Sequence, residues 1–430
     1  MQKIYGDMPV ADAPSVTDQP PAQLPPESEP PASAIYATYG VGFAGNGVAM
    51  MLKVLIPLWA IELQFSASQI GIAIGLSSLM PFLLSIHGGV LMDRLGVRRV
   101  TIAYALITAI VCPLYPFFPF FGAVLGLQLF TGLSSSMVWV GAQSLIIGYT
   151  KGKTTLIARF SVAARTGTLL GPVVIGAMWD LAGPFGAFSF VGGCALLVLV
   201  VLRMVPTTTE PATVSAPAPE PVKIKLWDLM PKWKDYAGAF SLIAIPAVAF
   251  VVAMTALRNS STGIQTSFYI VYLKEIGFFG TLIGVLVGLS EGAGIFGALI
   301  AGWWEKYIRP HWVLIGFVIM SLAFVSITPL LGGTFLLLAL ATAGRGFAQG
   351  LTQPVIFGVL ARAVDSSVQS TSIGLRTTSN RLSAVLVPFV MGFVADIVGI
   401  KNSFYVCGGF LIVCCIVVAL TIRRVPAFRD

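Results

Sequence analysis

Long apolar runs, separated by short polar stretches, fill most of the chain. Twelve of them can be traced, and each is long enough for a helix to cross the apolar core of a bilayer, which is about 30 Å thick and takes roughly 20 residues. The runs cover residues 36–62, 67–90, 99–117, 122–148, 156–180, 185–204, 237–272, 279–303, 312–331, 334–361, 370–397 and 402–424. This pattern predicts an all-α integral membrane protein with twelve transmembrane helices.

The longer polar segments divide the chain into two halves of six runs each. Residues 1–35 are rich in proline and acidic residues and lack the apolar region of a secretory signal peptide, so we expect a disordered N-terminal tail. Residues 205–236 interrupt the series after the sixth run and are predicted to form a cytoplasmic central loop. The segments 36–204 and 237–424 are each predicted to form a six-helix bundle, followed by a short cytoplasmic tail at 425–430.

The two halves repeat one another. A shift of 213 residues pairs Asn46 with Asn259, Gly71 with Gly284 and Gly75 with Gly288; a shift of 216 pairs Arg165 with Arg381, Pro172 with Pro388, Gly176 with Gly392 and Asp180 with Asp396. Arginine, proline and aspartate matching at one spacing indicate a duplication. Six spans in each half give both halves the same orientation, so the bundles are predicted to be pseudo-symmetric about an axis along the membrane normal, with a cavity between them.

Composition narrows the class of protein. Hydrophobic residues make up 56% of the chain and charged residues 10%, against about 25% charged in soluble domains. The net charge of +8 comes from residues in short loops, not from a patch, so no nucleic-acid partner is expected. The five cysteines lie inside apolar runs without paired spacing, and no catalytic constellation stands out; neither a metal or cofactor site nor an enzymatic activity is expected.

Basic loop residues predict the orientation. If both termini are cytoplasmic, eighteen Lys and Arg residues fall on the cytoplasmic side and only Lys274 and Lys401 fall outside. This asymmetry follows the positive-inside rule. We therefore expect a multi-pass protein of the cell (inner) membrane with both termini in the cytoplasm.

The segment "GGVLMDRLGVRR", residues 88–99, follows the second span. Its pattern of glycine, leucine and charged residues comprises Gly89, Leu91, Asp93, Arg94, Gly96, Arg98 and Arg99. This segment resembles the signature loop of the major facilitator superfamily. The resemblance implies a secondary active transporter that works by alternating access, in which Gly89 permits close helix approach and the charges form a network that breaks and reforms as the halves rock.

The fifth span carries a partial second resemblance, to the drug/proton antiporters of the same superfamily. Gly167, Gly171, Pro172 and Gly176 fit the glycine ladder of that group, while Ile175 stands where a further glycine is usual. Gln128 occupies the position of an arginine of that group; the corresponding region of the tenth span does contain Arg345. This resemblance implies a second hypothesis, efflux of drug-like amphipathic compounds by proton antiport.

Basic residues inside the spans outnumber acidic ones. A charge at the bilayer centre costs at least about 2.5 to 3.5 kcal/mol, so such a residue normally faces a cavity or a partner. The candidate substrate-binding residues are Lys53, Arg165, Arg258, Arg345 and Arg381, with Asn46 and Asn259 beside them. Their positive surplus favours an organic anion or an anionic metal chelate as substrate, although Arg165 and Arg381 could equally bond helix carbonyls or the other repeat.

Glu291 is the one acidic residue deep in a span. A carboxyl group in this setting can take up and release a proton, so it is the candidate for proton coupling; a salt bridge to one of the arginines is the alternative. Gly171, Pro172 and Pro388 join the signature loop as candidate conformational elements. The expected partners are a small-molecule substrate, the lipid bilayer and a proton, and the protein is expected to be a monomer. A transporter-like receptor that docks through its tail or central loop is a third hypothesis.

Overall fold

The computed structural model describes residues 32–150, 153–204, 242–363 and 366–425, which contain helices and no strand. The predicted tail up to residue 31, the predicted central loop and residues 426–430 lie outside the described residues. The elements are α1 (Ala32–Glu62), α2 (Ala67–Leu95), α3 (Val97–Val111), η1 (Cys112–Phe117), α4 (Phe121–Thr150), α5 (Thr154–Met204), η3 (Leu242–Ala244), α7 (Pro246–Gln265), α8 (Phe268–Glu275), α9 (Gly280–Trp304), α10 (Pro310–Ser326), η4 (Thr328–Leu331), α11 (Phe335–Ala363), α12 (Ser366–Val398) and α13 (Ile400–Arg424).

The prediction of twelve spans is confirmed. Eight helices of the described residues are long and apolar enough to cross a membrane, counting α3 together with η1. The 51-residue α5 supplies two spans, because Gly183 interrupts it with a φ of 61° and a ψ of −167°. The span predicted at 237–272 is divided between α7 and α8, with Thr266 and Ser267 at the break, and residues 237–241 lie outside the described residues.

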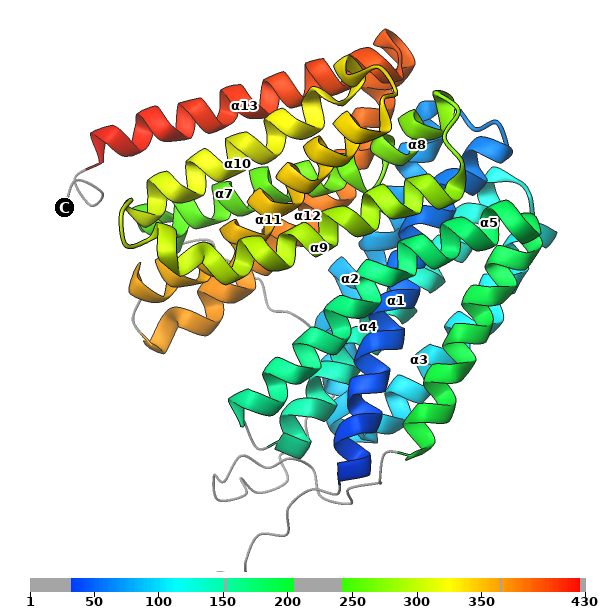
Figure 1. Cartoon of the computed structure of the whole chain (residues 1–430). Helices are drawn as coiled ribbons and strands as arrows, with labels where there is room; N and C mark the ends of the chain where they lie inside the picture. The colour runs from blue at the N-terminus through cyan, green and yellow to red at the C-terminus, as the bar shows by residue number, and fades with distance from the viewer. Residues whose placement is uncertain (1–31, 151–152, 205–241, 364–365, 426–430) are drawn as a thin grey trace, which may run out of the picture.

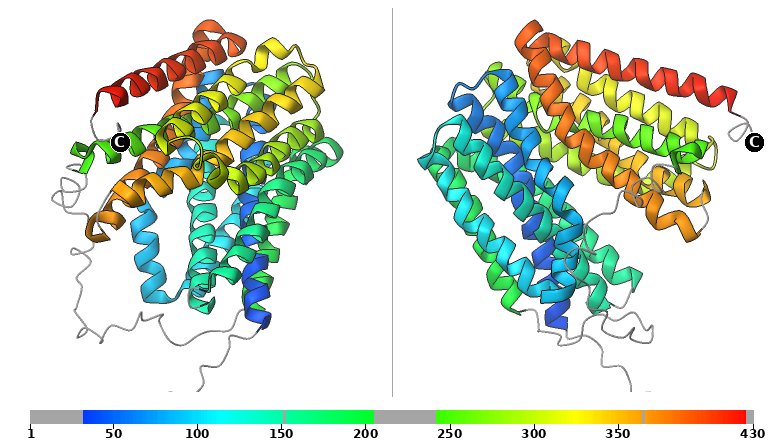
Figure 2. Two further views of the ribbon diagram at one scale, coloured as in Figure 1. Left: turned by 60° about the vertical axis from the view of Figure 1, so that its left-hand side comes forward. Right: turned by 180° about the vertical axis from the view of Figure 1, so that it is seen from behind.

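The two halves form two bundles (Figures 1 and 2). Helices α1 to α5 make the first bundle and α7 to α13 the second. The bundles meet at one end and diverge towards the other. We call the meeting end, with Glu62, Asp180, Gly280 and Ile400, the closed end, and the diverging end, with Leu95, Thr150, Trp304 and Arg424, the open end.

Most of the contact between the described parts of the bundles is made by two helix pairs, α2 with α12 and α5 with α9, and α1 also meets α8. Glycines permit the contact. A Cβ atom at Gly71 of α2 would overlap with the carbonyl oxygen of Pro388, and one at Gly284 of α9 with that of Pro172. Since these residues correspond to one another through the 213- and 216-residue shifts, the duplication has placed equivalent residues on both sides of the bundle interface.

The largest cluster of buried apolar side chains lies at the closed end and draws on both bundles. In the first bundle, the ring of Tyr115 stacks on Phe188 with centroids 4.7 Å apart. In the second, Phe268 and Tyr269 of α8 are fully or almost fully buried. This continuous apolar packing excludes water from the closed end, whereas separate smaller clusters hold each bundle together towards the open end.

Candidate functional site

A cavity of about 360 Å³ lies between the bundles. Helices α1, α2, α4 and α5 of the first bundle and α12 of the second line it. The lining residues are Asn46, Ala49, Met50, Leu52, Lys53, Ile56, Pro57, Ile74, Ser77, Ser78, Pro81, Gln128, Thr131, Gly132, Ser135, Ser136, Trp139, Thr168, Asn380 and Arg381. Three of the predicted substrate-binding residues therefore share one cavity: Asn46, Lys53 and Arg381.

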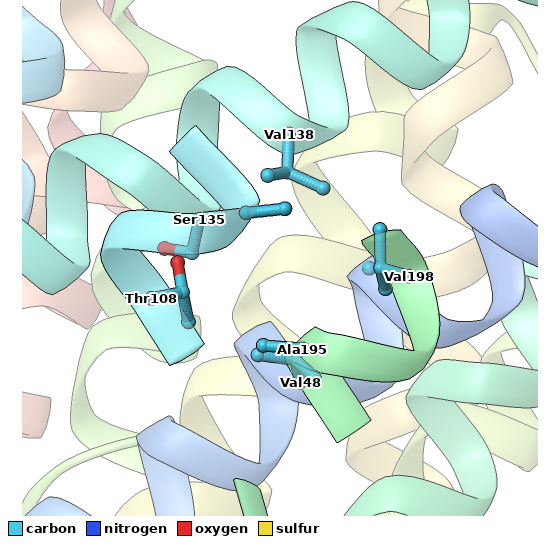
Figure 3. A pocket seen from close by; sticks show the side chains of 8 residues that line it. Val48, Thr108, Ser135, Val138, Ala195 and Val198 are labelled. Atoms are coloured by element: carbon cyan, nitrogen blue, oxygen red, sulfur yellow. The ribbon is translucent and has the colours of Figure 1, made fainter. Parts of the chain in front are cut away.

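A second pocket, of about 10 Å³, lies among α1, α3, α4 and α5 (Figure 3). Val48, Thr108, Val138 and Val198 are among the side chains around it. This volume is about that of a single water-sized probe. The pocket is therefore a packing space in the first bundle and is too small to hold a solute.

Two positive charges enter the larger cavity and no described acidic residue lines it. Lys53 reaches it from α1. Protein surrounds the Lys53 side chain, but the cavity leaves that side chain exposed. No described acidic group lies within ion-pair distance of it. Arg381 reaches the cavity from α12 and donates a 3.0 Å hydrogen bond from Nη2 to Oγ of Ser136 on α4. This bond crosses between the bundles, so the cavity contains a direct polar link between the two halves.

Arg165, the repeat partner of Arg381, does not line the cavity. It is half-buried on α5. The sequence left two interpretations open for the two arginines, substrate binding at the cavity or structural bonds, and the structure places only Arg381 at the cavity. The cavity is lined mainly by the first bundle, and equivalent residues of the two halves therefore meet different surroundings.

Arg258 lies in a polar network inside the second bundle. Its guanidinium donates to Oγ1 of Thr352 at 2.9 Å, to Oε1 of Gln353 at 2.9 Å and to the carbonyl oxygen of Gln349 at 3.0 Å, all on α11. Asn259 accepts a weaker bond, at 3.4 Å. Arg258 therefore binds α7 to α11, and neither of these two predicted site residues lines the cavity.

Arg345 and Glu291 lie near one another, between α9 and α11. Arg345 is 3% exposed and donates Nη2 to Oγ of Ser290 at 2.5 Å, whereas its Nε and Nη1 have no hydrogen-bond partner among the described residues. Glu291 follows Ser290 in α9 and is half-buried. It interacts electrostatically with Arg345, Arg258 and Lys53, but forms no ion pair within 4.0 Å with any described residue. The salt bridge considered from the sequence is not formed in this conformation.

The signature loop lies at the open end. Gly96, with a φ of 88°, ends α2 and begins α3. Arg98 donates to the carbonyl oxygens of Leu202 at 2.9 Å and Arg203 at 3.2 Å, and thereby caps the last turn of α5. Arg94 and Arg99 are exposed, and the side chain of Asp93 lies outside the described part of the structure.

Gly89 makes no close contact with another described helix in this conformation, and its close approach when the open end closes stays a prediction. Apart from its own helix and chain neighbours, no described atom lies within 4 Å of a Cβ built there, nor of one built at Gly302, its repeat equivalent in α9. Both glycines lie towards the open end, where the bundles are apart. Gly171, by contrast, packs against the backbone of Gly47 in α1.

Two aspartates at the closed end were not predicted as site residues. The carboxylate of Asp180 accepts hydrogen bonds from the backbone N–H groups of Gly280 and Thr281, at 2.8 and 2.7 Å, and from the Thr281 hydroxyl at 2.6 Å. That of Asp396 accepts from the N–H of Ser68 at 3.1 Å. Each aspartate caps a helix of the opposite bundle. The repeat in the sequence paired them, but only the tertiary structure shows what they bind.

Solved structures similar to this chain include membrane transporters. The family model of the Major Facilitator Superfamily matches residues 38–263 and again 248–429. A mutant of the nucleoside transporter NupG has a similar structure, with a TM-score of 0.76 and 14% identity over 90% of this chain and 99% of that one. A bacterial homologue of the human lysosomal transporter Spinster, inward-facing and unoccupied, has a TM-score of 0.72 and 14% identity over 90% and 96%.

A POT family transporter in complex with a thioalcohol-conjugated peptide has a TM-score of 0.69 and 12% identity, over 92% of this chain and 96% of that one. A search of curated proteins finds no match to the sequence. At these identities the solved structures show the fold alone, while the family match extends across both repeats. The chain therefore belongs to the Major Facilitator Superfamily and is a multi-pass membrane transporter of that superfamily.

Proposed function

We propose that the protein is a secondary active transporter of a small organic anion, working by alternating access. The observation that carries the proposal is the pairing of Lys53 and Arg381 in a cavity that no described acidic residue lines. Two like charges in a partly apolar enclosure repel each other and are costly to keep. An anionic group bound between them offsets both costs, whereas a neutral or cationic solute does not.

Arg381 can link binding to movement of the bundles. Its guanidinium has five N–H donors in a planar fork, and its one hydrogen bond to a described residue is to Ser136. The fork can therefore hold a carboxylate by two parallel bonds. Because Arg381 belongs to the second bundle and Lys53 to the first, an anion that binds both draws the two walls of the cavity together.

The basic loop residues favour a cytoplasmic position for both termini and hence for the open end. In that orientation the structure is an inward-facing state, in which the cavity faces the cytoplasm. Alternating access then requires the closed end to separate and the open end to close. We further propose the cell (inner) membrane as the location and Glu291 as the proton-coupling group, since this carboxylate is half-buried without an ion-pair partner among the described residues.

The experiment is uptake of an organic-anion panel into proteoliposomes with and without an imposed pH gradient. For an anion that is transported, Arg381→Gln should lower uptake at least about tenfold, as expected for loss of a buried charge-assisted bond. Arg165→Gln is the matched control, because this repeat-related arginine does not line the cavity. Equal losses in the two variants, or unchanged uptake in Arg381→Gln, would reject anion binding at this cavity.

Efflux of amphipathic compounds is the second candidate, and one observation favours it. Met50, Leu52, Ile56 and Ile74 give the cavity an apolar wall. If this is the function, strains that lack the protein should become more susceptible to amphipathic drugs, and the purified protein should exchange such a drug for protons. Neutral drugs should then be transported as well as anionic ones, which the first proposal does not allow.

A further inference from the structure

One face of α4 lines the cavity with polar side chains and, at one end, an aromatic ring. Gln128, Thr131, Ser135, Ser136 and Trp139 all line it. Successive members are three or four residues apart except for the adjacent Ser135 and Ser136, which puts all five on one side of the helix. The face therefore runs from an amide, through hydroxyls, to an indole ring.

Trp139 lies one turn from the point where Arg381 meets α4. Arg381 donates to Ser136, and residues three apart on a helix have Cβ atoms about 5–6 Å apart. An anionic group held by this guanidinium therefore lies about one helical turn from the indole. The charge and the aromatic surface form adjoining parts of one site.

The indole is held in place from behind. Its ring stacks on Phe160 of α5, with centroids 5.9 Å apart and planes 14° apart. Phe160 is 3% exposed and lies so close to Gly42 of α1 that a Cβ atom there would overlap with the phenyl ring. Three helices therefore fix the plane of Trp139, and this residue also lines the cavity. A rigid aromatic surface of this kind suits stacking with another flat ring.

We propose that the anion carries an aromatic ring: its anionic group binds Lys53 and Arg381, and its ring stacks on Trp139. This inference rests on the proposed anion transport and specifies the substrate class. The volume of about 360 Å³ is near the lower limit of small-molecule sites, which span about 300–1,000 Å³, so the site accepts a compact aromatic acid and not an extended one.

Three probes of similar shape test the inference on the purified full chain. Benzoate has both the charge and the ring, cyclohexanecarboxylate has the charge on a saturated ring, and benzamide has the aromatic ring without the charge. Dissociation constants are measured by calorimetry and ligand-observed NMR. We expect benzoate to bind about 3- to 10-fold more tightly than cyclohexanecarboxylate, the range for an aromatic pair beyond its buried area, and benzamide to bind least.

Variants of Trp139 locate the preference. Trp139→Leu should bind the two carboxylates equally, because its affinity for benzoate should fall more than its affinity for cyclohexanecarboxylate. Trp139→Phe should keep the preference for benzoate. Phe268→Leu, on α8, is a control that removes a ring which does not line the cavity and should leave the preference unchanged. Equal binding of both carboxylates to the wild-type chain, or a preference that survives in Trp139→Leu, would overturn the aromatic assignment.

Arg381→Gln separates this result from the underlying proposal. If anions bind the cavity, this variant should weaken benzoate and cyclohexanecarboxylate by the same factor and leave the ratio between them unchanged. If the two carboxylates bind equally but Arg381→Gln weakens both, anion binding stands and the aromatic assignment falls. Should benzamide bind as tightly as benzoate, both proposals fail.

Discussion

The carboxylate of Asp180 accepts a 2.8 Å hydrogen bond from the backbone N–H of Gly280, across the boundary between the two bundles. Phe279, the N-cap residue of α9, supplies no side-chain bond, so the helix takes its cap from α5. Asp396 has the equivalent contact with Ser68 of α2, whose own capping box is formed by Ser66 and Gln69. Both bonds exist only while the closed end is closed, and so they stabilise this conformation over one in which that end has separated.

We expect Asp180→Ala to weaken the closed end. Loss of a helix N-cap costs about 0.5–2 kcal/mol, and a change near 1 kcal/mol alters a two-state ratio about fivefold. Spin labels on the exposed positions Glu62→Cys and Glu275→Cys, at the closed ends of α1 and α8, allow the separation to be measured by double electron–electron resonance. The longer-distance population should grow in Asp180→Ala, and less in Asp396→Ala, which loses one bond instead of three.

Asp180→Asn and Ser66→Ala are the controls. Asparagine is a good N-cap, so Asp180→Asn should restore much of the short-distance population. Ser66→Ala removes a cap made within the first bundle, which should lower helix stability without changing the balance between conformations. A distance distribution that is unchanged in Asp180→Ala would show that the caps contribute nothing to closure.

Glycine substitutions test both ends of the interface. A Cβ at Gly71 overlaps with the Pro388 carbonyl oxygen, and one at Gly284 with that of Pro172, so Gly71→Ala and Gly284→Ala should also increase the separated population. Gly89→Ala lies in the same helix as Gly71 but faces open space, so it should not change the population in which the closed end has separated. The spin-label pair described above gives the comparison directly.

Larger side chains at the open end should act in the opposite direction. If Gly89 and Gly302 pack closely when the open end closes, Gly89→Leu and Gly302→Leu should hold the protein in the present conformation and slow transport. Labels at the closed end should then report only the short distance, and the turnover number should fall more than the affinity for substrate. Normal turnover in both variants would contradict a packing role for these glycines.

The hydrophobic pattern predicted the spans because a bilayer requires every backbone polar group to be bonded within a helix, which leaves long apolar runs in the sequence. The repeat predicted which residues are equivalent, and several of them, among them Gly71, Gly284, Pro172 and Pro388, lie at the bundle interface. Gly71 and Gly284 face the same surroundings because that interface is itself symmetric. The α7–α8 break at Thr266 was missed, since its polar residues lie within a run that remains apolar overall.

Side-chain roles were harder to predict than positions. A charge within a span must meet a cavity or a partner, but the sequence does not give the rotation of the helix about its axis. Arg258 was expected at the substrate site and instead binds three residues of α11. Arg165 and Arg381 are equivalent in sequence but not in surroundings, because the first bundle supplies most of the cavity wall.

Arg258 and Lys53 should respond oppositely when their charges are removed. Arg258→Met removes three hydrogen bonds to α11 and should lower the free energy of unfolding by about 2 kcal/mol or more. Arg258→Lys should lower the free energy of unfolding as well, because an ammonium group lacks the planar fork that reaches separate acceptors. Lys53→Met removes a charge without an ion-pair partner among the described residues, so stability should stay the same or rise while anion transport is lost. Melting temperatures in detergent, together with proteoliposome uptake, provide the comparison.

Glu291→Gln should separate proton coupling from substrate movement. If the carboxyl group carries the coupled proton, the neutral amide should abolish accumulation driven by a pH gradient, while exchange of labelled for unlabelled substrate across the membrane continues. Glu305→Gln is the matched control, since Glu305 follows the end of α9 and forms a 3.6 Å ion pair with Arg362. Because that residue lies at the open end, its neutralisation should leave gradient-driven accumulation intact. Accumulation that persists in Glu291→Gln would exclude this carboxyl group as the proton carrier. Loss of both accumulation and exchange would assign Glu291 to substrate binding or to folding instead.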